Sequence, residues 1–270
     1  MDLKSYTWIV VNSSAGKDSQ AMLDLVVEQA REQSVMERVV VVHCDLQRVE
    51  WEGTAELAER QAKHYGLRFI KVRRELGDLL VQVEQRGMWP DAQNRYCTSD
   101  QKRAQVDKVF TKLTSERRWT MSPWDKRKPP RVRILNCVGL RADESPKRAK
   151  MPDFEPLKRA SNGRREVNQW LPIHTWTEAQ VWERIKASGV PHHPAYDKGM
   201  PRLSCCFCIL ASKDALLLAG HHNRALLDEY VRIEQKIGHT FRHKLPILAI
   251  RDAVERGEQP APGRVANWCA

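Results

Sequence analysis

The segment from Ser13 to Ser19 (SSAGKDS) combines residue types that bind phosphate, and it lies between an apolar run ending at Val11 and a stretch with helical periodicity. Backbone N–H groups at a helix start point toward an anion, and small residues let a phosphate come close. The Lys17 ammonium and the serine hydroxyls would add contacts. The segment is not a Walker loop, because Val11 replaces the first glycine of that motif and Asp18 follows the lysine. The structural alternative is that the serines only cap the following helix.

The segment Cys205-Cys206-Phe207-Cys208 has the spacing of half a metal site, because a tight turn brings two thiolates to one ion. The spacing suits zinc or an iron–sulfur cluster, with the remaining ligands supplied from elsewhere in the chain. Cys137 lies in an apolar run, which favours a place in the core. Histidines are the alternative ligands. His239 and His243 have the i, i+4 spacing that places both on one helix face, and His221 and His222 are further candidates. Unliganded thiols are the alternative, and we expect no structural disulfide among the seven cysteines.

Strands and helices alternate in the first half of the chain. Short apolar runs rich in β-branched residues predict strands at 7–11, 38–43, 131–139 and, more weakly, 67–72. Periodicity of about 3.6 predicts helices near 18–30, 56–65, 76–85 and 101–113. This order is typical of an α/β fold with a doubly wound, mostly parallel sheet, in which ligands bind beyond the carboxyl ends of strands.

The chain changes character after about residue 175, which predicts two domains. We expect a nucleotide-binding α/β domain over 1–175 and a helical, cysteine-containing C-terminal subdomain over 176–270. Prolines make 122–130 a loop, and 143–166 shows no clear periodicity. Helices are predicted at 177–186, 214–219, 225–237 and 247–255, with an irregular segment at 191–201.

Composition indicates a globular chain of 270 residues, with 41% hydrophobic and 29% charged residues. It has no apolar run long enough to span a membrane and no visible secretory signal, so we expect a cytosolic protein without a membrane partner. The charge is uneven. The segment from Arg117 to Asn168 contains 15 Lys/Arg and six Asp/Glu residues, so it carries +9 of the formal net charge of +11. Such an excess is either a solvated basic insertion or a surface that faces nucleic acid.

The segment Ser14–Ser19 resembles the S-G-G-K-D-S loop of the N-type ATP pyrophosphatases, which include phosphoadenosine phosphosulfate (PAPS) reductases and enzymes that transfer sulfur to tRNA or DNA. Further blocks in the same order extend the resemblance to the PAPS-reductase-like family over roughly residues 8 to 210. These blocks are His43-Cys44-Asp45 with Glu50-Trp51 and Thr54, Arg95-Tyr96-Cys97-Thr98 with Lys102, Gly139 to Ser145, Pro172 to Thr177 with Val181-Trp182, and Arg202 to Cys208.

The resemblance implies roles for individual residues. Lys17, Asp18 and Arg141 would be catalytic, and Asp45 would lie near the nucleoside or its Mg²⁺. Cys97 would join Cys205 and Cys208 as a metal ligand, with Cys206 as the alternative. The phosphates of ATP, or those of PAPS, would be held by Ser13, Ser14, Ala15, Gly16, Lys17, Asp18, Ser19, Gly139 and Arg141. As structural alternatives, Asp45 would cap the next helix and Arg141 would pair with Asp143 or Glu144.

Two positions depart from the family pattern. Ala15 stands where the loop usually has glycine, so either the turn tolerates a negative φ here or nucleotide affinity is reduced, since a positive φ would cost alanine about 1 kcal/mol. The C-terminal E-C-G-x-H segment of assimilatory reductases is absent, and only Cys269 occupies a comparable position. This departure favours a function other than simple sulfate assimilation.

The preferred hypothesis is an ATP pyrophosphatase that uses ATP and Mg²⁺, and an iron–sulfur cluster if the thiols hold one. It would adenylate a nucleic acid, as in tRNA thiolation or DNA phosphorothioation, and take sulfur from a cysteine desulfurase or another persulfide donor. The nearest alternative is a PAPS or adenylyl-sulfate reductase. A third is a non-catalytic, nucleotide-sensing subunit of a nucleic-acid-modifying or defence complex.

Overall fold

The computed structural model describes residues 1–120 and 130–261, and the chain divides into two compact units. The first unit comprises 1–44, 55–72 and 105–192, and the second comprises 45–54, 73–104 and 193–270. The expected loop at 122–130 falls almost wholly outside the described residues, and so does Cys269.

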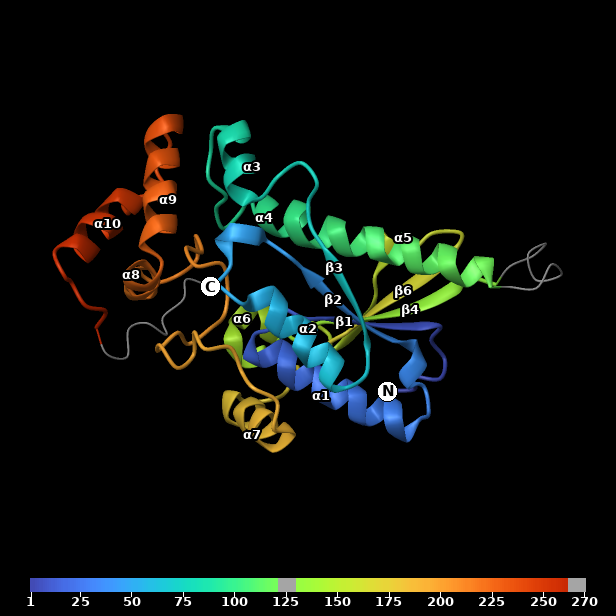
Figure 1. The fold of residues 1–270 in the computed structure, drawn as a ribbon. Helices are drawn as coiled ribbons and strands as arrows, with labels where there is room; N and C mark the ends of the chain where they lie inside the picture. Colours follow the sequence, from blue (N-terminus) through green and yellow to red (C-terminus); the bar gives the residue numbers. More distant parts are fainter. Residues whose placement is uncertain (121–129, 262–270) are drawn as a thin grey trace. The chain divides into compact units, whose positions relative to one another are not determined.

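The first unit contains a six-stranded sheet with the order β3-β2-β1-β4-β6-β5 (Figure 1). All neighbours pair in parallel except β5 and β6, which are antiparallel. The predicted α/β fold with a mostly parallel sheet is therefore confirmed. The strands are β1 (Trp8–Asn12), β2 (Val39–Cys44), β3 (Arg68–Val72), β4 (Val132–Cys137), β5 (Phe154–Pro156) and β6 (Arg165–Trp170).

Both faces of the central strands are buried, which explains their continuous apolar runs. Successive residues of a strand point to opposite faces, so Ile9 and Val11 enter one core and Val10 enters the other. The first core is covered by α1 (Lys17–Glu32) and α7 (Glu178–Ser188), and the second by α5 (Ala104–Trp119). Figure 1 shows α1 and α5 on opposite sides of the sheet.

The register of the sheet brings the segments that follow three of its strands to one edge. Val11 pairs with Cys137, and Cys137 pairs with Trp170, so β1, β4 and β6 end side by side. The residues that follow these strands therefore meet at the carboxyl edge, where parallel sheets bind ligands.

The basic stretch contains the strand predicted at 131–139 and two further strands that the sequence did not indicate. It contains β4 and β6 of the sheet, the edge strand β5 and a short helix, α6 (Pro146–Ala149). Strand β6 escapes prediction because its sequence, REVNQW, is largely polar, although Val167 and Asn168 are buried. Arg165 is buried as well; its Nε donates to the Ala160 carbonyl (2.7 Å) and its Nη1 to the Thr111 hydroxyl (2.8 Å).

The second unit is helical but does not begin at residue 176. It takes α3 (Leu79–Arg86) and α4 (Tyr96–Thr98) from the middle of the chain and α8 (Lys213–His222), α9 (Arg224–Ile237) and α10 (Ile247–Glu255) from its end. Helix α7 belongs to the first unit, because Val181 and Ile185 pack into the core of the sheet. The remaining helix, α2 (Thr54–His64), lies in the first unit from Ala55 onward. None of the helices described in the two ranges has the length and apolarity needed to cross a membrane.

Candidate nucleotide-binding site

The loop between β1 and α1 is fixed to the sheet through Ser13. The Ser13 N–H donates to the Val42 carbonyl (2.8 Å), and the Ser13 carbonyl lies 2.9 Å from Nδ1 of the buried His43. The Ser13 hydroxyl accepts from the Ala15 N–H (3.2 Å). These bonds hold the loop at the carboxyl edge of the sheet.

Helix α1 begins without a side-chain cap. Its N-cap residue is Gly16, which is extended (φ −79°, ψ 160°), and no side chain caps the first turn. The Ser19 hydroxyl instead donates to the Gly16 carbonyl (2.9 Å) and accepts from the Ser14 N–H (3.1 Å). The serines therefore shape the loop and leave the positive end of the helix dipole without a counter-charge from a cap.

Ala15 adopts the left-handed conformation, with φ +55°. The first of the two alternatives drawn from the sequence, a turn that tolerates negative φ, is therefore wrong. The loop retains the backbone shape that glycine would allow, and alanine adopts it at a cost of about 1 kcal/mol.

We expect Ala15→Gly to raise the free energy of unfolding by about 1 kcal/mol, because glycine removes the steric cost of the positive φ. Urea denaturation followed by circular dichroism measures the change. Ala187→Gly, at an exposed helical position of α7, is the matched control and should lower stability by about 0.5–1 kcal/mol. Loss of stability in both variants would contradict the strain at Ala15.

Gly139, which follows β4, lies directly against the first turn of α1. A Cβ at this position would lie 3.0 Å from the Asp18 carbonyl oxygen and 3.1 Å from the Ser19 nitrogen. Both neighbours are backbone atoms and cannot rotate away. Only glycine lets the turn after β4 approach the start of α1 this closely.

Gly139→Ala should therefore displace the phosphate-binding loop, lower the free energy of unfolding by about 1–3 kcal/mol and weaken nucleotide binding about tenfold. Calorimetric titration with ATP and urea denaturation measure the two effects. Gly163→Ala is the control, because a Cβ there meets nothing within 4 Å. Equal behaviour of the two variants would show that the close approach has no functional role.

Arg141 is buried beside the loop and is surrounded by carboxylates. Its Nε donates to Asp18 Oδ1 (2.6 Å), and its Nη1 donates to both oxygens of Asp143 (2.5 and 2.6 Å). The Trp176 carbonyl accepts a longer bond from the same nitrogen (3.3 Å). The pairing with Asp143 was one of the structural alternatives for Arg141, and it coexists with the contact to α1.

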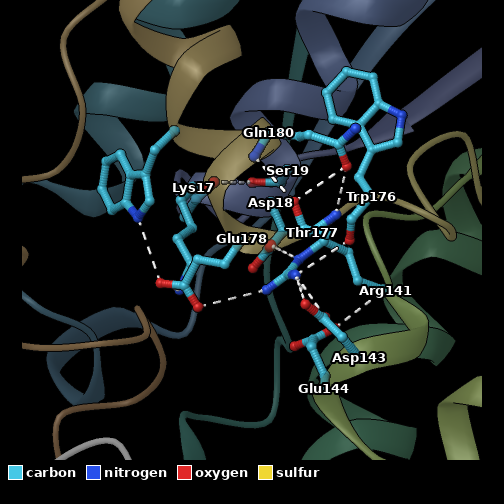
Figure 2. A network of polar contacts seen from close by, with 12 residues as sticks. Lys17, Asp18, Ser19, Arg141, Asp143, Glu144, Trp176, Thr177, Glu178 and Gln180 are labelled. Carbon is cyan, nitrogen blue, oxygen red and sulfur yellow. Dashed lines mark hydrogen bonds and ion pairs between the residues drawn. The ribbon is translucent and has the colours of Figure 1, made fainter. Parts of the chain in front are cut away.

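Lys17 and Arg141 converge on the same carboxylate, as Figure 2 shows. Lys17 Nζ lies 3.4 Å from Glu178 Oε1, and Arg141 Nη2 lies 3.8 Å from Glu178 Oε2. Burial raises the pKa of Asp18 above its usual value, although the charges of Lys17 and Arg141 lower it. The site is therefore a buried cationic pair at a helix N-terminus, an arrangement suited to a phosphate chain.

Asp45 serves a local structural role. Its Oδ1 accepts from the N–H of Gln47 (2.8 Å), the first residue of the 3-10 turn Gln47–Val49. Asp45 also belongs to the second compact unit, whereas the loop belongs to the first. Its contact with a nucleoside or Mg²⁺ remains a proposal.

The four predicted metal-ligand cysteines belong to the second unit, and none of the six described cysteines forms a disulfide. Burial raises the pKa values of Cys205, Cys206 and Cys208, and that of Cys206 reaches about 12. The charge of Cys97 also raises the pKa values of Cys205 and Cys208. As placed, no three His, Cys, Asp or Glu side chains in the described residues are arranged to hold a metal ion.

An orphaned hydroxyl lies next to the cysteine turn. Tyr230 is fully buried, and its hydroxyl is without a hydrogen-bond partner among the described residues. The centroid of its ring lies 5.0 Å from that of Phe207, the residue between Cys206 and Cys208 in the sequence. The ring also stacks on Trp89, at a centroid distance of 5.3 Å. A buried donor of this kind suits sulfur atoms bound at the turn.

The other predicted ligands take structural positions. Cys137 is fully buried in β4 and packs in the first core. Helix α9 ends at Ile237 with a left-handed Gly238, so His239 and His243 do not share a helix face. His221 lies 2.7 Å from the Glu258 carbonyl, and His222 packs against Trp51.

A model of the phosphoadenosine phosphosulfate reductase domain matches residues 8–211. The chain belongs to this family. An uncharacterized protein of Methanocaldococcus jannaschii is 26% identical over 200 residues, which cover 74% of this chain and 36% of that protein. Adenosine 5'-phosphosulfate reductase of Allochromatium vinosum is 36% identical over 74 residues, or 27% of each chain. The matches thus span about a third or less of these relatives.

Solved structures are similar to this chain at low sequence identity. PAPS reductase from Candida auris, a phosphate complex, gives a TM-score of 0.48 at 16% identity and covers 76% of this chain and 84% of its own. The U34-tRNA thiolase from Methanococcus maripaludis, with its 4Fe–4S cluster, gives a TM-score of 0.45 at 13% identity. The match covers 95% of this chain and 73% of the thiolase chain.

Sequence reasoning missed Glu178. Thr177 and Gln180 form a capping box that marks the start of α7, and an acidic residue in the first turn of a helix is ordinarily explained by the helix dipole. No pattern along the chain indicates that this carboxylate lies beside Lys17, because the sheet brings the two segments together.

Proposed function

We propose that the protein is an ATP pyrophosphatase that adenylates an oxygen of a nucleic acid and prepares it for replacement by sulfur. The observation that carries the nucleotide part is the convergence of Lys17 and Arg141 at the uncapped N-terminus of α1. Two buried cations at a helix N-terminus are groups that could stabilise the charge on a leaving pyrophosphate.

The reaction assigned to this site has two stages. The acceptor oxygen attacks the α-phosphorus of ATP, the bond from that phosphorus to the bridging oxygen breaks, and pyrophosphate leaves with the bonding electrons. A persulfide then attacks the adenylated carbon or phosphorus and displaces AMP. A thiol cleaves the resulting S–S bond and is oxidised to a disulfide, which leaves the sulfur on the acceptor.

The chain's own residues bind and orient the phosphates. Lys17, Arg141 and the backbone of the loop would hold the β- and γ-phosphates as charge develops on them. Mg²⁺ would enter bound to ATP, because this ion is ordinarily held by substrate phosphates and one or two carboxylates rather than by a complete protein cage. Asp45 is the proposed carboxylate.

The nucleic-acid acceptor is supported by basic side chains of the first unit. Those exposed among the described residues of the basic stretch are Arg117, Arg131, Lys147, Lys150, Lys158, Arg159 and Arg164. Arg159 is paired with Asp107 at 2.6 Å, whereas the backbone N–H of Arg164 donates to Asn162 Oδ1 in a turn (2.9 Å). Exposed cations of this kind bind a phosphate backbone without reading its sequence.

Pyrophosphate release from ATP, measured with and without tRNA or DNA, tests the proposal. Acceptor-dependent release is the expected result, and Lys17→Ala should reduce it on the order of 100-fold, because one charge-stabilising group is lost. Lys186→Ala, on the exposed side of α7, is the matched control and should leave the rate unchanged. No release with any acceptor would remove the adenylation step, and tight ATP binding without turnover would favour the nucleotide-sensing alternative.

An iron–sulfur cluster is part of the proposal. Cys97, Cys205 and Cys208 would hold it, with Cys206 as a fourth or alternative ligand, and the Tyr230 hydroxyl would donate to a sulfur. Thiols with raised pKa values release their protons only to a strongly bound metal. A cluster would supply a site for sulfur binding or electron transfer. Anaerobic purification followed by metal and sulfide analysis tests this part, and Cys137→Ser is the control that should keep the metal.

A PAPS or adenylyl-sulfate reductase is the second candidate, favoured by the local identity to the Allochromatium vinosum enzyme. It would release sulfite from a sulfonucleotide with reduced thioredoxin. Sulfite release without acceptor-dependent pyrophosphate release would decide for this candidate.

A further inference from the structure

Glu178 occupies the place of an anion between the two cations of the site. Its two carboxylate oxygens divide between Lys17 Nζ (3.4 Å) and Arg141 Nη2 (3.8 Å). In Figure 2 the carboxylate lies between these two side chains. The bonds join α1, the turn after β4 and α7, so the contact forms only in the folded protein.

The first turn of α7 does not account for this position. Thr177 and Gln180 already cap the helix reciprocally, through Thr177 Oγ1 and Gln180 Oε1. The Glu178 side chain turns toward Lys17, and Trp182 Nε1 donates to the same carboxylate at 3.4 Å. Its placement therefore follows from the cations and from an indole one turn later.

The three charges differ in exposure. The side chains of Lys17 and Arg141 are 4% exposed, whereas that of Glu178 is 53% exposed. Buried cations require counter-charges, and a half-exposed carboxylate can rotate into water at little cost. Asp18 and Asp143 bind other nitrogens of Arg141, so departure of Glu178 would leave those two bonds in place and remove only its own contacts to Lys17 Nζ and Arg141 Nη2.

We infer that Glu178 is a displaceable counter-ion that sets the affinity threshold of the phosphate site. The pyrophosphate group of a nucleotide must replace the carboxylate on Lys17 and Arg141, so an anion that gains too little from these cations stays out. The inference rests on the proposed nucleotide-binding function and adds to it a residue that determines affinity.

Calorimetric titration of Glu178→Gln with pyrophosphate and with inorganic phosphate, without Mg²⁺, tests the inference. The glutamine keeps the size of the side chain and an oxygen for Trp182 but lacks the charge. Both ligands should bind about tenfold more tightly than to the wild type, which corresponds to about 1.4 kcal/mol, because the cost of displacement is common to both. Binding by the variant should also weaken more steeply with salt. Glu183→Gln, at an exposed position of the same helix, is the control and should match the wild type.

Other outcomes overturn the inference in distinguishable ways. Unchanged affinity would show that Glu178 does not compete with the ligand, and weaker affinity would make it a residue that positions Lys17 and Arg141. Weaker binding of ATP only when Mg²⁺ is present would assign the carboxylate to the metal. Absence of pyrophosphate and ATP binding in every variant, wild type included, would overturn the proposed function itself.

Discussion

Arg141→Ala is expected to abolish measurable ATP binding and to lower the free energy of unfolding by about 3 kcal/mol. Arg141 is buried and meets Asp18, Asp143 and Glu178 through different nitrogens. Removing one partner of a buried ion pair leaves the other uncompensated, which costs about 3–5 kcal/mol when both are buried. The lower value applies here, because Asp143 and Glu178 are about half exposed.

Two further variants distinguish the effect of losing the Arg141 cation from the effect of leaving the Asp18 carboxylate without its partner. Urea denaturation of Asp18→Asn in the Arg141→Ala background should recover part of the lost stability, since Asp18 is the least exposed of the three carboxylates. ATP binding should stay absent in this double variant. Arg164→Ala, which removes an exposed arginine of a turn distant in sequence from the loop, should change neither quantity. An Arg141→Ala protein that binds ATP normally would refute the assigned role.

Glu234→Ala is expected to destabilise the second unit by about 3 kcal/mol without touching the phosphate-binding loop. The buried Glu234 carboxylate accepts from the backbone N–H groups of Phe241 (2.6 Å), Ile247 (3.0 Å) and Leu248 (3.1 Å). The last two belong to the first turn of α10, whose N-cap residue, Pro246, provides no side-chain acceptor. Alanine would leave three donors without their acceptor, and hydrogen bonds to a charged group are the costly ones to lose.

Denaturation of Glu234→Ala, Glu234→Gln and Gln235→Ala measures this effect. Glutamine retains one acceptor oxygen and should lie between alanine and the wild type. Gln235 is exposed in the same helix, so its replacement should change stability by less than about 0.5 kcal/mol. Equal stability of all three variants would mean that Glu234 does not determine the position of α10.

The sequence predicts the elements whose local pattern and tertiary environment agree. Strands β1 and β2 are recognisable because helices cover both faces of the sheet and nearly every residue must be apolar. Strand β6 lies in the same sheet but is largely polar, and its arginine and asparagine are satisfied by hydrogen bonds that only the folded chain provides. The polar sequence of β6 therefore does not predict a strand, although β6 is part of the sheet.

The domain boundary illustrates the same limit. Helix α7 and the cysteine-containing segment follow one another in the chain, but the apolar face of α7 packs on α1 while the cysteines join α3, α4 and α9 in another unit. Long-range packing, rather than composition, decides which segments share a core.

The sequence alone determined the strand β1, the loop after it and the helix α1, because backbone shape and small residues act locally. It also identified Arg141, through its place after a later strand. The tertiary structure alone decided that Gly139 closes against α1 and that Glu178 meets Lys17. Both contacts join segments far apart in the chain, and the sheet register that brings them together is a property of all the strands at once.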